Sequence, residues 1–323
     1  MNWPTRKILR KLRKRHAALH PEMHKTDFPK IDYSGQEAGD YIKNLLAKNQ
    51  PSLICRMGLG ELRVIVNYLD ISNPASFWEK SRDYITGKRD RFWWEPVHRT
   101  DIANFSGFFP TTDEALSRFS VESLADMKHI DVLGSWRKLE NRIHDYFPPT
   151  MVRVPLSDLE SFHHKDPWSE ILAGKKVLVI HPFEQSIRQQ YAKRKMLFKD
   201  PRVLPDFELK TLRAVQSLVG NKVEFNNWFD ALDSMRKKMD QIDFDIALIG
   251  AGAYGFPLAA HAKKMGKQGI HLGGATQMFF GIRGKRWDDD FSGYQDIINE
   301  HWIRPQPDER PKNAHLLEGG AYW

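Results

Sequence analysis

Short apolar runs, each followed by a turn and then by a helical pattern, limit the fold of this chain more than any other feature. These runs are Ser52–Arg56, Lys176–Ile180, Phe244–Ile249 and Gly269–Leu272. Continuous apolar strands of this kind are typical of a parallel sheet that is buried on both faces. Because helices alternate with the strands, the sequence predicts an α/β fold with a mostly parallel, Rossmann-like sheet and helices on both faces.

Helical segments are predicted from apolar periodicity and from capping residues. Ser34 and Glu37 have the spacing of a capping box and predict a helix that runs to about Asn49. A further strand is predicted at Ile130–Leu133. The other predicted helices are Leu62–Leu69, a helix between Asn73-Pro74 and Gly87, Thr112–Met127, Trp136–Tyr146, Ser186–Lys195, Trp228–Met239 with Asn227 as its cap, and Phe256–Met265.

The positive charge of the chain is concentrated in its first residues. Residues 1–25 contain eight Lys or Arg and one acid, which accounts for +7 of the formal net charge of +8. The remainder is therefore nearly neutral, which argues against the binding of nucleic acid to a basic folded face. The single cysteine, Cys55, excludes an internal disulfide and a zinc-ribbon site and fits a reducing compartment.

Residues 1–30 are predicted to form a basic, amphipathic helical arm. On a helix, one side would carry Ile8, Leu9, Leu12, His16 and Leu19. Such a helix, with Trp3 nearby, suits an anionic membrane surface contacted through residues 1–25. The alternatives are a solvated tail, or a helix docked on this chain or on a second copy of it.

Residues 31–323 are predicted to be a single domain with an irregular tail from about residue 287. The most apolar run, Phe244–Ala262, contains Asp245, three glycines and Pro257. It is therefore unlike the ~20 continuous apolar residues of a membrane-spanning helix. Nor do the first 19 residues have the apolar region of a secretory signal. We expect a cytoplasmic protein that is peripheral at the inner face of the membrane.

Chemistry-bearing residues follow the strands, where ligands bind in sheets of this type. Directly after the first strand comes Arg56-Met57-Gly58-Leu59-Gly60-Glu61. Its glycines allow a tight turn, the following helix start favours an anion, and Arg56 can form two hydrogen bonds to a phosphate. Glu61 could act on a metal, a sugar hydroxyl or a proton, although an acid in a first helical turn is also favoured by the helix dipole alone.

Two further motifs follow later strands. His181 and Ser186 precede or open a predicted helix, as in a phosphate or sugar pocket, although a histidine here can equally be structural. The run Gly250–Gly255 has the G-x-G-x-x-G spacing between a strand and a helix. An acid that would bind a ribose is missing about 20 residues later, since the next strand ends at His271 and Gly273. No NAD is therefore expected, whereas a phosphate-bearing ligand is.

Three further segments contain weaker candidates for contacts with a sugar, a metal or a diphosphate. The NFSGFFP run could form a sugar-facing loop around Asn104, Gly107 and Phe108, but a packed turn is the simpler interpretation. Asp288-Asp289-Asp290 has the look of a metal cluster, although such runs are more often solvated. The basic residues before it, Arg283, Lys285 and Arg286, could meet a diphosphate or pair with those acids.

The RMGLGE run resembles the R-x-G-x-x-E signature of glycosyltransferases of the GT-D fold type, in which the family reads R-F-G-D-G-E. The later LIGAGAYGFPLAAHAKKMGKQGIHLGG resembles a second signature of the same family. HPFEQSIRQQY and IHLGGATQMFFGIRGKRW are similar to a branch associated with bacterial capsule and O-antigen polysaccharide synthesis. The resemblance is patchy and spans roughly residues 34–290.

Carried over by position, the resemblance makes Glu61 and Arg56 the catalytic residues. It also implies Mn(II) or Mg(II) held by a D-x-E pair, but Leu59 stands where the family has Asp and cannot ligate a metal. Glu61 could bind the metal alone with the donor diphosphate, or basic side chains could take the role of the cation. The residues expected around the donor and its phosphates are Gly58, Gly60, His181, Ser186, Gly250, Gly252, Tyr254, Gly255, His271, Gly273 and Gly274.

These features predict a glycosyltransferase that moves a sugar from a nucleotide-sugar donor to a growing bacterial surface glycan. The acceptor would be a glycan or a lipid-linked glycan, and self-association stays open. One alternative is another enzyme with a phosphate-bearing ligand, such as a nucleotide-sugar-modifying oxidoreductase or a methyltransferase. The other is a non-catalytic assembly protein of the same fold, for which Leu59 is the best argument.

Overall fold

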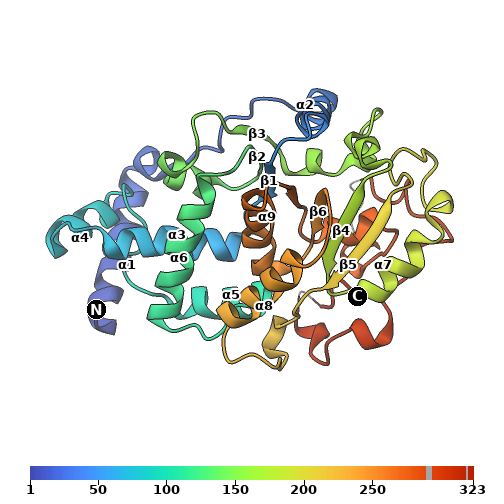
Figure 1. Cartoon of the computed structure of the whole chain (residues 1–323). Coiled ribbons are helices and arrows are strands. Elements are labelled where there is room, and N and C mark those ends of the chain that lie inside the picture. The colour runs from blue at the N-terminus through green and yellow to red at the C-terminus, as the bar shows by residue number, and fades with distance from the viewer. Residues whose placement is uncertain (289–292, 318) are drawn as a thin grey trace.

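The computed structural model describes residues 1–288, 293–317 and 319–323. In these residues, seven strands form one sheet in the order β3-β2-β1-β7-β6-β4-β5. Every strand pair is parallel, and helices cover both faces of the sheet (Figure 1). The predicted α/β fold with a Rossmann-like parallel sheet is confirmed.

The strands have the bounds expected for the four apolar runs, to within about two residues. The first run is strand β1 without any shift, whereas two additional strands, β3 and β5, were not predicted. The strands are β1 (Ser52–Arg56), β2 (Val132–Ser135), β3 (Val152–Pro155), β4 (Lys176–His181), β5 (Glu208–Arg213), β6 (Ile246–Ile249) and β7 (Gln268–His271).

The alternation of side chains along each strand builds two separate cores. In β4, Leu178 and Ile180 lie in the core on one face, whereas Val177 and Val179 lie in the core on the other. The first face is covered by α3, α5, α6, α8 and α9, and the second by α2, α7, α10 and the tail. Both faces of the sheet are therefore buried, which explains why apolar and polar residues do not alternate along these strands.

The helices occupy most of the segments predicted for them. Their bounds are α1 (Trp3–Leu19), α2 (Gln36–Ala47), α3 (Leu59–Ser72), α4 (Phe77–Ile85), α5 (Pro96–Ser106), α6 (Asp113–Met127), α7 (Glu184–Tyr191), α8 (Trp228–Asp240), α9 (Gly255–Lys264), α10 (Ala275–Phe279) and α11 (Lys285–Asp288). The Asn227 side chain caps α8 as predicted, accepting a hydrogen bond of 2.9 Å from the backbone of Asp230.

Two local predictions are wrong. The residue that caps α2 is Gly35, not Ser34, so the predicted capping box does not form. The backbone N–H of Gly35 donates a hydrogen bond of 2.6 Å to the carboxylate of Asp158. Gly35 has a φ of +58°, a conformation that glycine adopts at little cost, so the chain turns there. The segment predicted as a helix at Trp136–Tyr146 is an irregular 3₁₀ segment, Lys138–Tyr146.

The basic arm forms α1, which packs along α4 at one end of the molecule (Figure 1). Leu9 is buried in a small cluster with Tyr84 and Trp93. Arg10 pairs with the buried carboxylate of Glu95. These contacts fix one face of the helix on the body and leave its other faces in solvent.

The tail wraps the far end of the sheet and meets helix α7 (Figure 1). Its Glu309 is 1% exposed and lies at the start of α7. One carboxylate oxygen accepts hydrogen bonds of 2.7 and 3.2 Å from the backbone N–H groups of Gln185 and Ser186, and the other accepts the Ser186 hydroxyl. The tail thus supplies the anion that this helix start favours.

Candidate active site

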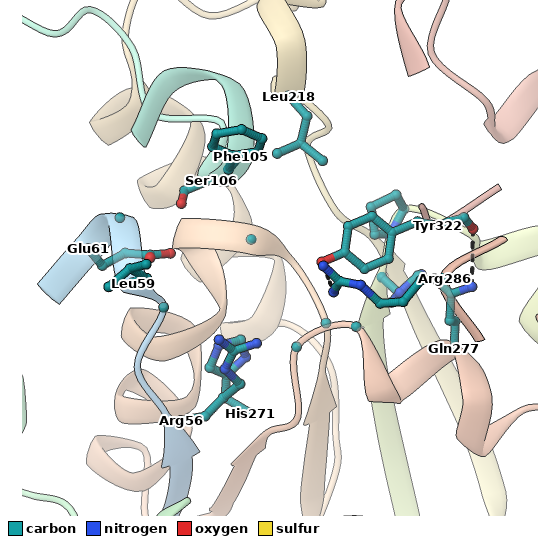
Figure 2. A pocket seen from close by; sticks show the side chains of 18 of the residues that line it. Arg56, Leu59, Glu61, Phe105, Ser106, Leu218, His271, Gln277, Arg286 and Tyr322 are labelled. Carbon is teal, nitrogen blue, oxygen red and sulfur yellow. Dashed lines mark hydrogen bonds between the residues drawn. The ribbon is translucent and has the colours of Figure 1, made fainter. Parts of the chain in front are cut away.

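A cavity of roughly 450 Å³ opens beyond the carboxyl ends of β1, β4, β6 and β7. Ten of the thirteen predicted site residues line it: Arg56, Gly58, Gly60, Glu61, His181, Gly250, Gly252, His271, Gly273 and Gly274. Figure 2 shows Leu59 and Glu61 on one side of this cavity and Arg286 and Tyr322 on the other. The first and the last parts of the chain therefore meet at one site.

The first wall consists of the end of β1 and the start of α3. Gly58 is the capping residue of α3, and no side chain of the described residues caps the N–H groups in the first turn of this helix. The carboxylate of Glu61 folds back against Gly58, which has no Cβ to obstruct it. Among the described residues, Glu61 has neither a hydrogen-bond partner nor an ion-pair partner. Its carboxylate is therefore available to a ligand.

Two histidines, at the ends of the strands on either side of β6, are buried and neutral. Burial lowers the pKa of His181 to about 3, and the Nδ1 of this ring accepts a hydrogen bond of 3.0 Å from the backbone N–H of Phe183. Its Nε2 therefore carries the proton and can donate to a ligand. Burial, together with the charge of Arg56, lowers the pKa of His271 to about 3. The Nδ1–H of His271 donates to Ile249 O at 3.2 Å, which leaves its Nε2 as an acceptor.

The G-x-G-x-x-G run is required by packing within the chain itself. A Cβ on Gly252, whose φ is +54°, would lie 2.8 Å from the carbonyl oxygen of Ser106. A Cβ on Gly250 would lie 2.6 Å from Gly273 O, and one on Gly255 would overlap the ring of His271. These glycines hold three loops together under the cavity. Their spacing is thus explained without a dinucleotide.

Three of the predicted residues lie outside the cavity. Ser186 is fully buried and its hydroxyl is bound to Glu309. Tyr254 stacks on Trp228, with ring centroids 5.1 Å apart, and its hydroxyl lies 3.1 Å from Ser217 Oγ. Gly255 lies against His271 beneath the site.

The opposite wall comes from α11 and the end of the tail. The Nη1 of Arg286 donates to the Tyr322 hydroxyl at 3.2 Å, as drawn in Figure 2. The amide of Gln277 donates to the carbonyl of Tyr322 at 3.1 Å. The absence of a side chain on Gly274 leaves room for the Tyr322 ring. Arg286 was a weak candidate for a diphosphate contact and does line the cavity; Asp289 and Asp290 lie outside the described residues.

Several lining residues were not singled out from the sequence. Trp136 and Arg137 directly follow strand β2, so the rule that ligands meet the carboxyl ends of strands could have found them. Phe105 and Ser106 belong to the NFSGFFP run, in which Asn104, Gly107 and Phe108 were the predicted contacts. Tyr322 and Trp323 come from the tail, whose path no local pattern predicts.

The described residues do not fit the metal that the family resemblance implies. Leu59 lines the cavity beside Glu61 and offers no ligating atom. In the described part of the chain, no group of three or more His, Cys, Asp or Glu side chains could hold a metal ion. Asp101, the other acid of the cavity, is paired with Arg63 at 2.8 Å.

One segment of the chain is similar to a known family of domains. Residues 157–279 match the family model of the GT-D fold-like domain. The matched segment contains β4 to β7, with His181, the glycine run and His271, whereas the RMGLGE run precedes it. Neither the curated proteins nor the solved structures contain a match to the chain. The similarity supports a glycosyltransferase-type fold for this part of the chain.

Proposed function

We propose that this protein is a glycosyltransferase that moves a sugar from a nucleotide-sugar donor to a growing bacterial surface glycan. The observation that carries the proposal is the junction of two elements in one cavity. Arg56 and Glu61 of the first motif face the strand ends of the segment that is similar to the GT-D fold-like domain. A cavity of this size, with a few polar groups among apolar ones, suits a small polar ligand.

The proposed reaction is a direct transfer in which the side chains of the cavity have separate roles. The unfilled N–H groups at the start of α3 and the guanidinium of Arg56 bind donor phosphate. The Nε2–H of His181 donates to a phosphate or sugar oxygen. Glu61, which has no partner in the described ranges of the chain, positions the acceptor hydroxyl or takes its proton.

A dinucleotide-dependent oxidoreductase is the weaker candidate. In such enzymes an acid at the end of the second strand of the βαβ unit binds the ribose. Here the unit is β6-α9-β7, and β7 ends in His271. The glycine run that would approach a pyrophosphate is instead closed on Ser106.

The test of the proposal is a thermal-shift panel of UDP-, GDP-, CMP- and dTDP-sugars, followed by a turnover assay with the donor that binds. A ligand at 100 times its Kd should stabilise the protein by ~2.7 kcal/mol, which a melting experiment detects. Donor turnover is the expected result. A panel without any binding would favour the non-catalytic assembly protein, and a shift with NAD(P) would favour the oxidoreductase.

We further propose that the arm brings the enzyme to an anionic membrane surface, where a lipid-linked acceptor would be found. No helix in the described residues could cross a bilayer. Helix α1 keeps large apolar side chains in solvent, namely Trp3, Ile8, Leu12 and Leu19. Lys11, Lys14 and Arg15 are exposed beside them, and each base near anionic lipid contributes about 1 kcal/mol.

Reversing the charge of these three bases is expected to abolish binding to vesicles of phosphatidylglycerol and phosphatidylcholine. The triple variant Lys11→Glu, Lys14→Glu, Arg15→Glu leaves the buried contacts of Leu9 and Arg10 in place, so the fold should persist. Vesicle sedimentation measures the effect, and salt should weaken binding by the unmodified protein because it screens charge. Equal sedimentation of the variant would disprove the membrane role.

A further inference from the structure

Arg56 and Arg137 come from neighbouring strand ends and share the ring of Trp136. Their guanidinium carbons lie 4.8 and 3.5 Å from the centroid of that ring. β1 and β2 are paired in parallel, so the residues that end them or follow them emerge at the same edge of the sheet. We call Arg56, Trp136 and Arg137 the arginine–tryptophan stack.

The stack is held by buried hydrogen bonds that fix its loop. The indole N–H of Trp136 donates to Met57 O at 2.9 Å. Glu140 is completely buried and accepts the backbone N–H groups of Trp136 and Arg137 at 3.0 and 2.9 Å, together with the Ser135 hydroxyl. The loop is therefore preorganised before any ligand arrives.

Within the part of the chain that the structure describes, the two guanidinium groups have no carboxylate partner. Among the described residues, neither Arg56 nor Arg137 forms an ion pair, and the Nε atom of each is buried without a hydrogen-bond acceptor. Burial and the nearby charges of Arg56 and Arg63 lower the pKa of Arg137. Two like charges are thus held together where water is partly excluded, an arrangement that an anion would stabilise.

In the described part of the chain, none of the acids around the stack is paired with Arg56 or Arg137. Asp101 pairs with Arg63, and the oxygens of Glu140 are taken up by its loop. Glu61 lies against Gly58. His181 and His271 are neutral and add no charge. The anion that fits is therefore one with at least two negative groups, each able to accept a planar guanidinium.

We propose that the arginine–tryptophan stack binds the diphosphate of the donor and takes the place of a divalent cation at this site. This inference rests on the proposed function and adds the substrate class, a nucleoside-diphosphate sugar. In the transfer, the bond between the sugar C1 and the diphosphate oxygen breaks and its electron pair stays on the diphosphate. The acceptor oxygen forms the new bond to C1, and its proton passes to Glu61. Arg56 and Arg137 stabilise the charge that grows on the departing diphosphate.

Isothermal titration calorimetry of the whole chain with UDP, GDP and dTDP, and with the matching monophosphates, tests the inference. At least one diphosphate should bind in EDTA, more tightly than its monophosphate, and Mn(II) should not be required. Arg137→Lys and Arg56→Lys should each weaken the binding of that diphosphate by about 10–100-fold, since lysine keeps the charge but loses the paired hydrogen bonds.

Arg118→Lys is the matched control, because Arg118 also lies over an aromatic ring, 3.8 Å from the centroid of Phe229, but outside the cavity. It should bind the diphosphate as the unmodified protein does, and circular dichroism melts establish that each variant is folded. Diphosphate binding that needs Mn(II), or that survives both lysine variants at the stack, would overturn the inference. If diphosphates bind as expected and no sugar donor is turned over, the inference stands and the transferase proposal fails.

Discussion

Glu61→Gln is expected to lower kcat by roughly 10²–10⁴-fold with the fold unaffected, if Glu61 handles the acceptor proton. Glutamine keeps the size and reach of the side chain and removes only its charge and basicity. The carboxylate lines the cavity and has no partner among the described residues, so no structural contact is lost. The measurement is turnover of the donor identified by the panel, together with a thermal melt.

Glu114→Gln is the control for the helix dipole, because Glu114 is an exposed acid in the first turn of α6, away from the cavity. If Glu61 only stabilised its helix, both variants should cost at most about 1 kcal/mol of unfolding free energy and leave turnover intact. Near-normal turnover in Glu61→Gln would remove this residue from the chemistry. The His181 side of the cavity would then be the place to look for the base.

Gly252→Ala should reduce the free energy of unfolding by roughly 2–5 kcal/mol, because both the backbone conformation and the space around this residue disfavour a side chain. The φ of +54° at residue 252 is unfavourable for alanine, and the Cβ of the alanine would lie 2.8 Å from the carbonyl oxygen of Ser106. That oxygen belongs to the end of α5 and cannot move without the helix. Chemical denaturation measures the loss.

Gly174→Ala separates the two causes. Gly174 has a φ of +71°, and a Cβ there would meet no atom within 4 Å. This control should cost only about 1–2 kcal/mol, the backbone component alone. Equal losses for the two variants would show that contact with Ser106 is unimportant, and would return Gly252 to a role in ligand approach.

Five of the seven strands that the structure describes could be predicted from the sequence because their cause is local, whereas β3 and β5 were missed. A run such as KVLVI has no polar alternation, and burial on both faces of a parallel sheet is what such a run requires. The ends of these strands then located Arg56, His181 and His271 at one edge.

The sequence does not indicate which helix N-terminus is open to a ligand and which is satisfied within the chain. The N-termini of α3 and α7 look alike in the sequence. Each follows a strand and a short loop, and each has an acid in the first turn of the helix. In the folded chain, Glu309 reaches the start of α7 and satisfies its N–H groups, whereas those of α3 stay open toward the cavity. The segment that decides between them lies more than 100 residues away in the sequence.

The sequence by itself determined the parallel sheet, the basic arm and the residues at the strand ends, because apolar periodicity and charge are properties of short segments. Only the tertiary structure decided that Arg137 joins Arg56 over Trp136, that the arm docks through Leu9, and that Tyr322 closes the far wall of the cavity. Each of these contacts joins residues far apart in the chain. Its free energy depends on burial and on the geometry of two surfaces, which no local pattern specifies.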